Sequence, residues 1–161
     1  MFSKQLNKIN NLIQNIKNSS NISIISDFLD WFLEVLNLSF NKKYKNFTPN
    51  KWEIYFVNLW KNIWSELNKN RPCIIYSNYF LNNWDNIIII PLKSYKWKNN
   101  RNINIFIWWT KLNWLIKDSI VDLMWIRQIS KKRVSKLIWK VDKKIIFKID
   151  NKLLKILNIK K

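Results

Sequence analysis

The chain has 161 residues, with 29 lysines and arginines against 10 acidic residues and a net charge of +19. That length fits one domain with an appendage, and the charge favours a polyanionic partner such as nucleic acid. With no histidine and a single cysteine, Cys73, the chain offers neither an internal disulfide nor a zinc site of the usual kind, so we expect no metal and no cofactor. No signal peptide or membrane-spanning apolar run is visible, so we expect a cytoplasmic protein without a membrane partner.

The first 50 residues predict a helical extension. Apolar residues recur every three or four positions in Phe2–Lys17, and a second helix is expected over Asp27–Leu38 with Asp27 as its cap or first-turn acid. Phe40–Asn50 is typical of a linker. Amphipathic stripes usually mark core-facing helices, which favours a pair packed on the rest of the chain for stability. A regulatory or partner-docking arm is the alternative.

From Lys51 the pattern changes to short β runs separated by polar turns. Residues that suit a pleated, half-buried surface dominate Glu53–Leu59, Pro72–Asn78 and Asn86–Ser94. Asn102–Trp108 alternates isoleucine with other residues and predicts a further strand, and Ser119–Ile129 predicts another.

The end of the chain is expected to be helical and strongly basic. Ser130 can cap a short helix over Lys131–Ile138, and Asp142 can cap a last helix that runs to about Leu157. From Arg127 onwards there are 13 basic residues against 2 acidic ones. Beside a nucleic-acid groove, that excess would add affinity through counterion release.

One group of motifs points to a family. Ser65-Glu66 is followed, after four residues, by Arg71-Pro72 and a β run, and the chain later contains Asp118–Val121 and Ile126–Ile129. Together these segments resemble the MazF/PemK family of toxin endoribonucleases, which usually shows Gly-Ser-Glu, four variable residues, Arg-Pro and a strand, then Pro-x-Thr-Ser. The resemblance covers residues 51–161 and implies an α+β, mainly β fold. That fold is a small SH3-like barrel with a C-terminal helix, preceded here by the extension at 1–50.

The resemblance also implies an activity. A member of this family would be the toxin of a toxin–antitoxin system, a homodimer that cleaves single-stranded RNA in a sequence-specific way and is inhibited by an acidic, MazE-like or other antitoxin. Because the ribose 2′-OH is the nucleophile, an RNase without metal or histidine is chemically possible. The alternative is a catalytically inactive nucleic-acid-binding barrel, since the family threonine is missing.

The resemblance assigns site residues by position. Arg71 stands where the family keeps the arginine that binds phosphate and stabilises the transition state, a task that suits its planar fork. In place of the threonine the chain has Lys93, which could neutralise phosphate charge, followed by Ser94, which could supply a hydroxyl; adjacent strand residues face opposite sides. Ser65 and Glu66 would support the loop or Arg71. RNA contacts are expected from two loops, at Lys61, Lys69, Tyr95, Lys96 and Lys98.

The chain contains 11 tryptophans and no glycine, whereas glycine is usually near 7% of residues. Several tryptophans stand where the family or a tight turn requires glycine. We interpret them as UGA codons that some bacteria read as glycine, and we expect a positive φ at Trp64 and Trp84. AT-rich composition is the alternative, but it does not account for tryptophan at turn positions. The positions concerned are Trp52, Trp60, Trp64, Trp84 and Trp139.

Overall fold

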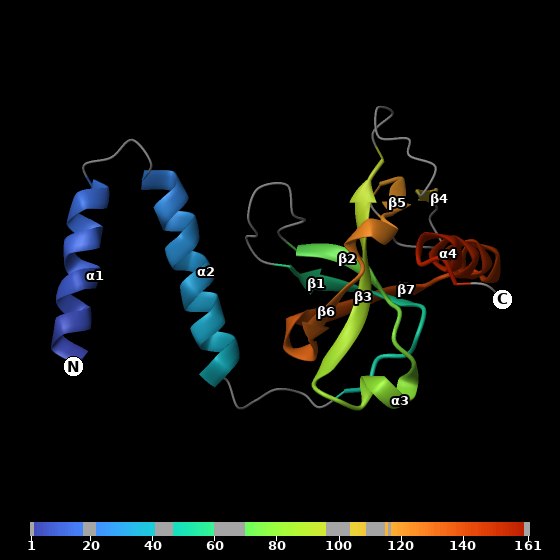
Figure 1. Ribbon diagram of the computed structural model, residues 1–161, viewed down its shortest axis with the longest axis horizontal. Coiled ribbons are helices and arrows are strands. Elements are labelled where there is room, and N and C mark those ends of the chain that lie inside the picture. Colours follow the sequence, from blue (N-terminus) through green and yellow to red (C-terminus); the bar gives the residue numbers. More distant parts are fainter. Residues whose placement is uncertain are drawn as a thin grey trace. The chain divides into compact units, whose positions relative to one another are not determined.

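The computed structural model describes residues 2–17, 22–40, 47–59, 70–95, 104–108, 115 and 117–159 (Figure 1). The chain forms two compact units, Met1–Lys43 and Tyr44–Lys161. No helix within the described ranges is long and apolar enough to cross a bilayer. Six predicted site residues lie outside these ranges, namely Lys61, Ser65, Glu66, Lys69, Lys96 and Lys98.

The first unit is an antiparallel pair of helices, α1 (Phe2–Lys17) and α2 (Ile22–Phe40) (Figure 1). The predicted bounds of α1 are confirmed. The predicted start of α2 is wrong: Asp27 lies inside the helix, because Ile22 and Ile25 continue its apolar spacing by one more turn.

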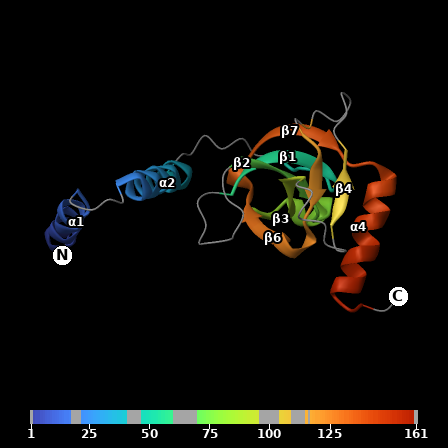
Figure 2. The same cartoon turned by 90° about the horizontal axis from the view of Figure 1, so that it is seen from above.

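The second unit is an antiparallel β-structure in the order β4-β5-β3-β2-β1-β7, with β6 also paired to β3. The start of β3 pairs with β6, its middle with β2 and its end with β5, so this long strand curls the sheet into the predicted small barrel (Figure 2). The strands are β1 Glu53–Asn58, β2 Asn70–Ile75, β3 Asn86–Ser94, β4 Ile105–Ile107, β5 Ser119–Val121, β6 Arg127–Ser130 and β7 Val134–Lys140.

Helices complete this unit. A short helix, α3 (Tyr79–Asn82), precedes β3, and the predicted terminal helix is confirmed as α4 (Lys143–Ile156). Ile149 and Leu153 of α4 are buried against one face of the sheet, in a cluster with Ile74. A second buried cluster, which contains Cys73, covers the other face. The α4 helix lies alongside β4 (Figure 2).

Two predicted elements at the end of the chain are wrong. Ser119–Ile129 is not one strand, because the Asp122 carboxylate accepts the Met124 N–H at 3.2 Å and caps a single 3₁₀ turn, Leu123–Trp125. Lys131–Ile138 is not a helix either. Ser130 caps only a 3₁₀ turn, and the residues beyond it pair with β1 as β7, which satisfies their backbone groups across the sheet.

The backbone at the tryptophans differs from expectation. Among the described residues, only Trp52 (φ 73°) and Asn158 (φ 54°) have positive φ. The expectation for Trp84 is wrong, because α3 brings the chain round before β3 begins, and the Trp84 N–H donates to the Leu81 carbonyl at 3.1 Å. Trp52 is held on both sides of its peptide: its N–H donates to Ile75 and its carbonyl accepts from Val141, at 2.7 and 2.9 Å. Trp64 lies outside the described residues.

Candidate active site

A pocket opens where β2 and β3 separate. The β2–β3 ladder runs from Ile75 to Cys73, which pairs with Pro91, and it extends no further towards the start of β2. Pro72, the next residue of β2, has no N–H to donate to a ladder. Beyond this point lies a pocket of about 340 Å³. Two prolines therefore lie where the two strands begin to part.

Arg71 and Lys93 lie at this opening. Cys73 of β2 pairs with Pro91 of β3. If the same register is extended by two residues along each strand, Arg71 lies opposite Lys93. Residues opposite each other in an antiparallel pair project to the same face. Both residues line the pocket, so a group that enters it meets two cations from neighbouring strands.

An ion pair positions Lys93. Its Nζ lies 2.6 Å from the Asp122 carboxylate, and these side chains are 29% and 11% exposed. The same Nζ lies 5.3 Å from the centre of the Trp125 ring. Because Asp122 also caps the 3₁₀ turn after β5, the lysine is anchored through this carboxylate to the backbone of that turn.

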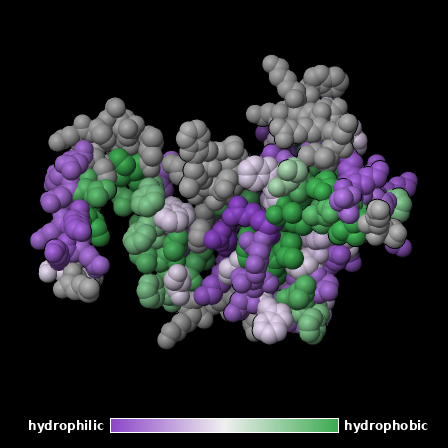
Figure 3. Space-filling view, in the orientation of Figure 1, coloured by the Kyte–Doolittle hydropathy of each residue, from purple (hydrophilic) through white to green (hydrophobic). Residues whose placement is uncertain are grey.

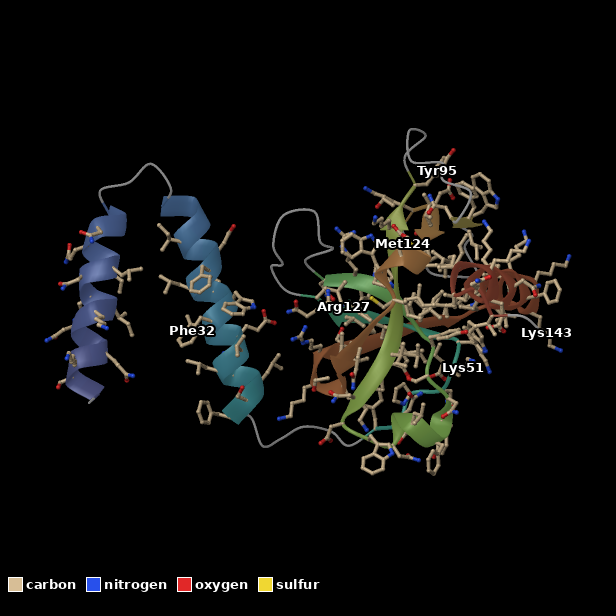
Figure 4. The ribbon with its side chains drawn as sticks, viewed as in Figure 1. Phe32, Lys51, Tyr95, Met124, Arg127 and Lys143 are labelled. Carbon is tan, nitrogen blue, oxygen red and sulfur yellow. The ribbon has the colours of Figure 1, made fainter. Side chains whose placement is uncertain are left out.

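Arg127 adds positive charge to the same face of the sheet. Arg127 pairs with Ile89 of β3, which in turn pairs with Ile75 of β2. These three residues therefore lie on the face of the sheet that also carries Cys73. Burial raises the pKa of the Cys73 thiol, whereas the nearby charges of Arg71 and Arg127 act in the opposite direction. Cys73 is fully buried, as predicted for a small hydrophobic residue. Figure 4 labels Arg127.

The lining of the pocket combines cations, hydroxyls and an apolar surface. Lys117 joins Arg71 and Lys93 as a third cation, and none of the described lining residues is acidic. Ser94 and its ladder partner Ser119 offer hydroxyls, and Asn70 offers an amide. The apolar part of the lining includes Phe56, Leu92, Leu115 and Ile138. The pocket can therefore hold an anionic group with a planar or apolar body attached to it.

The structure thus brings together three predicted residues, Arg71, Lys93 and Ser94, in one pocket. Tyr95 follows directly at the end of β3, where its N–H donates to the Asp118 carbonyl at 2.9 Å and its ring packs edge-on against Phe106.

Other residues of this site are not among those predicted from the sequence. Lys117, Ser119 and Asp122 flank or belong to the Asp118–Val121 segment already recognised as a family motif. That motif was the available signal, but only the β3–β5 pairing places it beside Lys93.

Fold and pocket define the class of protein: a small antiparallel barrel with a cationic site for an anionic group. A family model, described as PemK-like, MazF-like toxin of type II toxin-antitoxin system, matches residues 50–157. The chain belongs to this family of endoribonuclease toxins. The helices α1 and α2 precede the matched region.

Solved structures show the same fold. MazF from Deinococcus radiodurans is similar with a TM-score of 0.60 and 13% identity, over 70% of this chain and 99% of that one. An endoribonuclease in complex with its cognate antitoxin, from a mycobacterial species, has a TM-score of 0.55 and 16% identity, over 71% and 97%. Toxin MazF-mt6 from Mycobacterium tuberculosis has a TM-score of 0.54 and 13% identity, over 68% and 99%. No curated protein matches the sequence.

Proposed function

We propose that this toxin cleaves single-stranded RNA at the Arg71 pocket without a metal ion, through attack of a ribose 2′-OH on the adjacent phosphorus. The O2′–P bond forms and the P–O5′ bond breaks. The 2′-OH proton passes to solvent and the departing 5′ oxygen takes up a proton, which leaves a 2′,3′-cyclic phosphate and a 5′-OH. The observation that carries the proposal is the placement of Arg71 and Lys93 at one pocket between β2 and β3.

Each residue then has a role. The Arg71 guanidinium would hold the phosphoryl oxygens with two parallel hydrogen bonds and stabilise the charge that builds on them. Lys93, anchored by Asp122, would act as a fixed point charge. Ser94 and Ser119 would contact the ribose or a base. Ser65 and Glu66 stay predicted supporting residues.

The decisive experiment is incubation of the protein with single-stranded RNA in excess chelator, followed by analysis of the new ends. Cyclic phosphate and 5′-OH termini that appear with the native chain and not with Arg71→Ala are the expected result. Tight binding without cleavage would instead support the catalytically inactive barrel, the alternative that the missing family threonine favours. Cleavage that requires added metal would contradict the mechanism.

We further propose that the toxin acts in the cytoplasm as a homodimer and is held inactive by an acidic antitoxin. The net charge of +19 offers such a peptide a strong electrostatic target. Two of the similar structures are complexes of MazE with MazF from Deinococcus radiodurans. Competition between the antitoxin and RNA tests this, and simultaneous binding of both at full affinity would contradict it. Light scattering tests the dimer.

A further inference from the structure

A second basic groove lies between β4 and α4. Its volume is about 1040 Å³, and it shares no lining residue with the Arg71 pocket. Lysines of α4 line one side, and Phe106 and Trp108 line the other. Hydrophilic side chains gather over α4 in Figure 3, and Figure 4 labels Lys143 there.

The lysines of this groove form a row. Lys144, Lys148 and Lys152 are four residues apart, so they lie along one line of the helix at intervals of about 6 Å. Lys143 adds a fourth cation, and Asp142 is the one acidic residue among the described lining. A row of like charges at this spacing repels itself, and it suits successive phosphates of an extended strand.

Lys152 shows how crowded these charges are. Its Nζ donates to the Asn104 carbonyl at 2.9 Å, which ties α4 to the segment that leads into β4. Its pKa is lowered, first by burial and then by the positive charges of Lys148 and Lys155. A bound polyanion would relieve this repulsion.

Two aromatic residues of the β4 segment, Phe106 and Trp108, line the same groove as the lysines. The rings of Phe106 and Trp108 stack with centres 6.2 Å apart and planes 18° apart, and Tyr95 packs edge-on against both. Trp108 is 62% exposed. Exposed aromatic faces beside a basic groove are the combination that holds single strands, because every base has a face that can stack. In a duplex the faces of the bases are already stacked on one another, and an acidic peptide has no bases to stack on the rings.

We propose that the α4–β4 groove is a second binding track for single-stranded RNA, with phosphates along the α4 lysines and a base on the Phe106–Trp108 pair. The track goes beyond the cleavage proposed for the Arg71 pocket. It would lengthen the stretch of RNA that the protein holds while leaving the reacting phosphate elsewhere.

The test measures binding of an RNA that cannot be cleaved. A labelled 20-nucleotide 2′-O-methyl RNA is titrated by anisotropy at several salt concentrations with the full chain. The test variant is Lys144→Gln/Lys148→Gln. The matched control is Lys132→Gln/Lys136→Gln, which removes the same charge from exposed positions outside the groove. Circular dichroism melting checks that both variants are folded.

Losing two phosphate contacts should weaken binding about 10- to 25-fold at 0.1 M salt and reduce the slope of log K against log salt by about 1.4. The control should change binding less than about threefold. Trp108→Ala should weaken binding at least about fivefold through lost stacking. Because the probe has no free 2′-OH, these results do not depend on catalysis, and repeating them with Arg71→Ala separates this proposal from the previous one.

Several results would overturn the track. Equal losses in the two double variants would show that net charge alone matters, and unchanged RNA binding in the test variant would remove the site. If RNA binding is unchanged while binding of a poly-glutamate peptide weakens, the groove serves an acidic protein and the proposal fails.

Discussion

Lys93 and Asp122 join β3 to the end of β5 through an ion pair with a 2.6 Å contact. Asp122 is only 11% exposed, so removing Lys93 leaves a nearly buried carboxylate without its cation. We expect Lys93→Thr, which restores the family residue, to lower the free energy of unfolding by about 1–3 kcal/mol. Lys93→Thr/Asp122→Asn should recover most of that loss, since asparagine can still cap the turn. Urea unfolding of the two single variants and the double variant gives the coupling, and strictly additive losses would contradict it.

Arg71 is expected to serve cleavage and contribute little to stability. Arg71→Ala should lower kcat at least about 100-fold, the cost of removing one donor to developing charge. Arg71→Lys should recover little, because an ammonium lacks the planar fork. Single-turnover cleavage of a short RNA measures both variants, and thermal unfolding is the control. Activity of Arg71→Ala within about tenfold of the native chain would refute the assignment.

The Tyr76 phenol should make stability depend on pH in the alkaline range. Burial, then the charge of Asp150, raises the pKa of Tyr76 to about 12, and its OH donates to the Asp150 carboxylate at 3.2 Å. The unfolded chain ionises this phenol near pH 10, so the stabilisation is complete below that pH and is lost between about pH 10 and 12. Between about pH 10 and 12, the free energy of unfolding of Tyr76→Phe should therefore fall less than that of the native chain. Urea unfolding from pH 9 to 12 measures it, with Tyr79→Phe, an exposed tyrosine, as control. Parallel curves for the native chain and Tyr76→Phe would contradict the prediction.

The backbone at Trp52 should prefer glycine. Its φ of 73° lies in the left-handed region, where a side chain costs about 1–2 kcal/mol. Trp52→Gly and Trp52→Ala lose the same ring packing against Tyr76, but only alanine keeps the strain, so the glycine variant should be the more stable by about 1 kcal/mol. Trp84 has no positive φ, and there the order should reverse. Thermal unfolding of the four variants decides. Mass spectrometry of the native protein separately tests whether glycine stands at these positions.

A buried lysine should stabilise the barrel. Lys131 is 4% exposed, and its Nζ donates to the carbonyls of Phe47, Asn82 and Asn83 at 3.1–3.5 Å. Lys131→Met should lower the free energy of unfolding by about 1–3 kcal/mol, because it leaves the buried Asn82 carbonyl without this donor. Chemical unfolding measures the loss, and Lys132→Met, at an exposed neighbour, is the control. Equal effects of the two substitutions would show that the burial of Lys131 does not matter.

Elements with a clear hydrophobic pattern could be predicted from the sequence. The bounds of β3 were predicted in full, since an unbroken apolar run closed by polar residues suits a central strand. The helices α1 and α4 follow from apolar spacings of three and four. The resemblance to the MazF/PemK motifs also singled out Arg71, Lys93 and Ser94.

Other features depend on contacts between segments that are far apart in the sequence. Val134, Leu137 and Ile138 have helical spacing, yet pairing with β1 makes this segment β7, because the edge of β1 offers partners for its backbone groups. The sequence places Asp122 within a predicted strand. Its cap on the Met124 N–H is a local contact, whereas its ion pair with Lys93 depends on β3 lying beside β5. The pocket itself has the same origin. Prolines at 72 and 91 are visible in the sequence, but only the register shows that they lie near each other where the ladder ends.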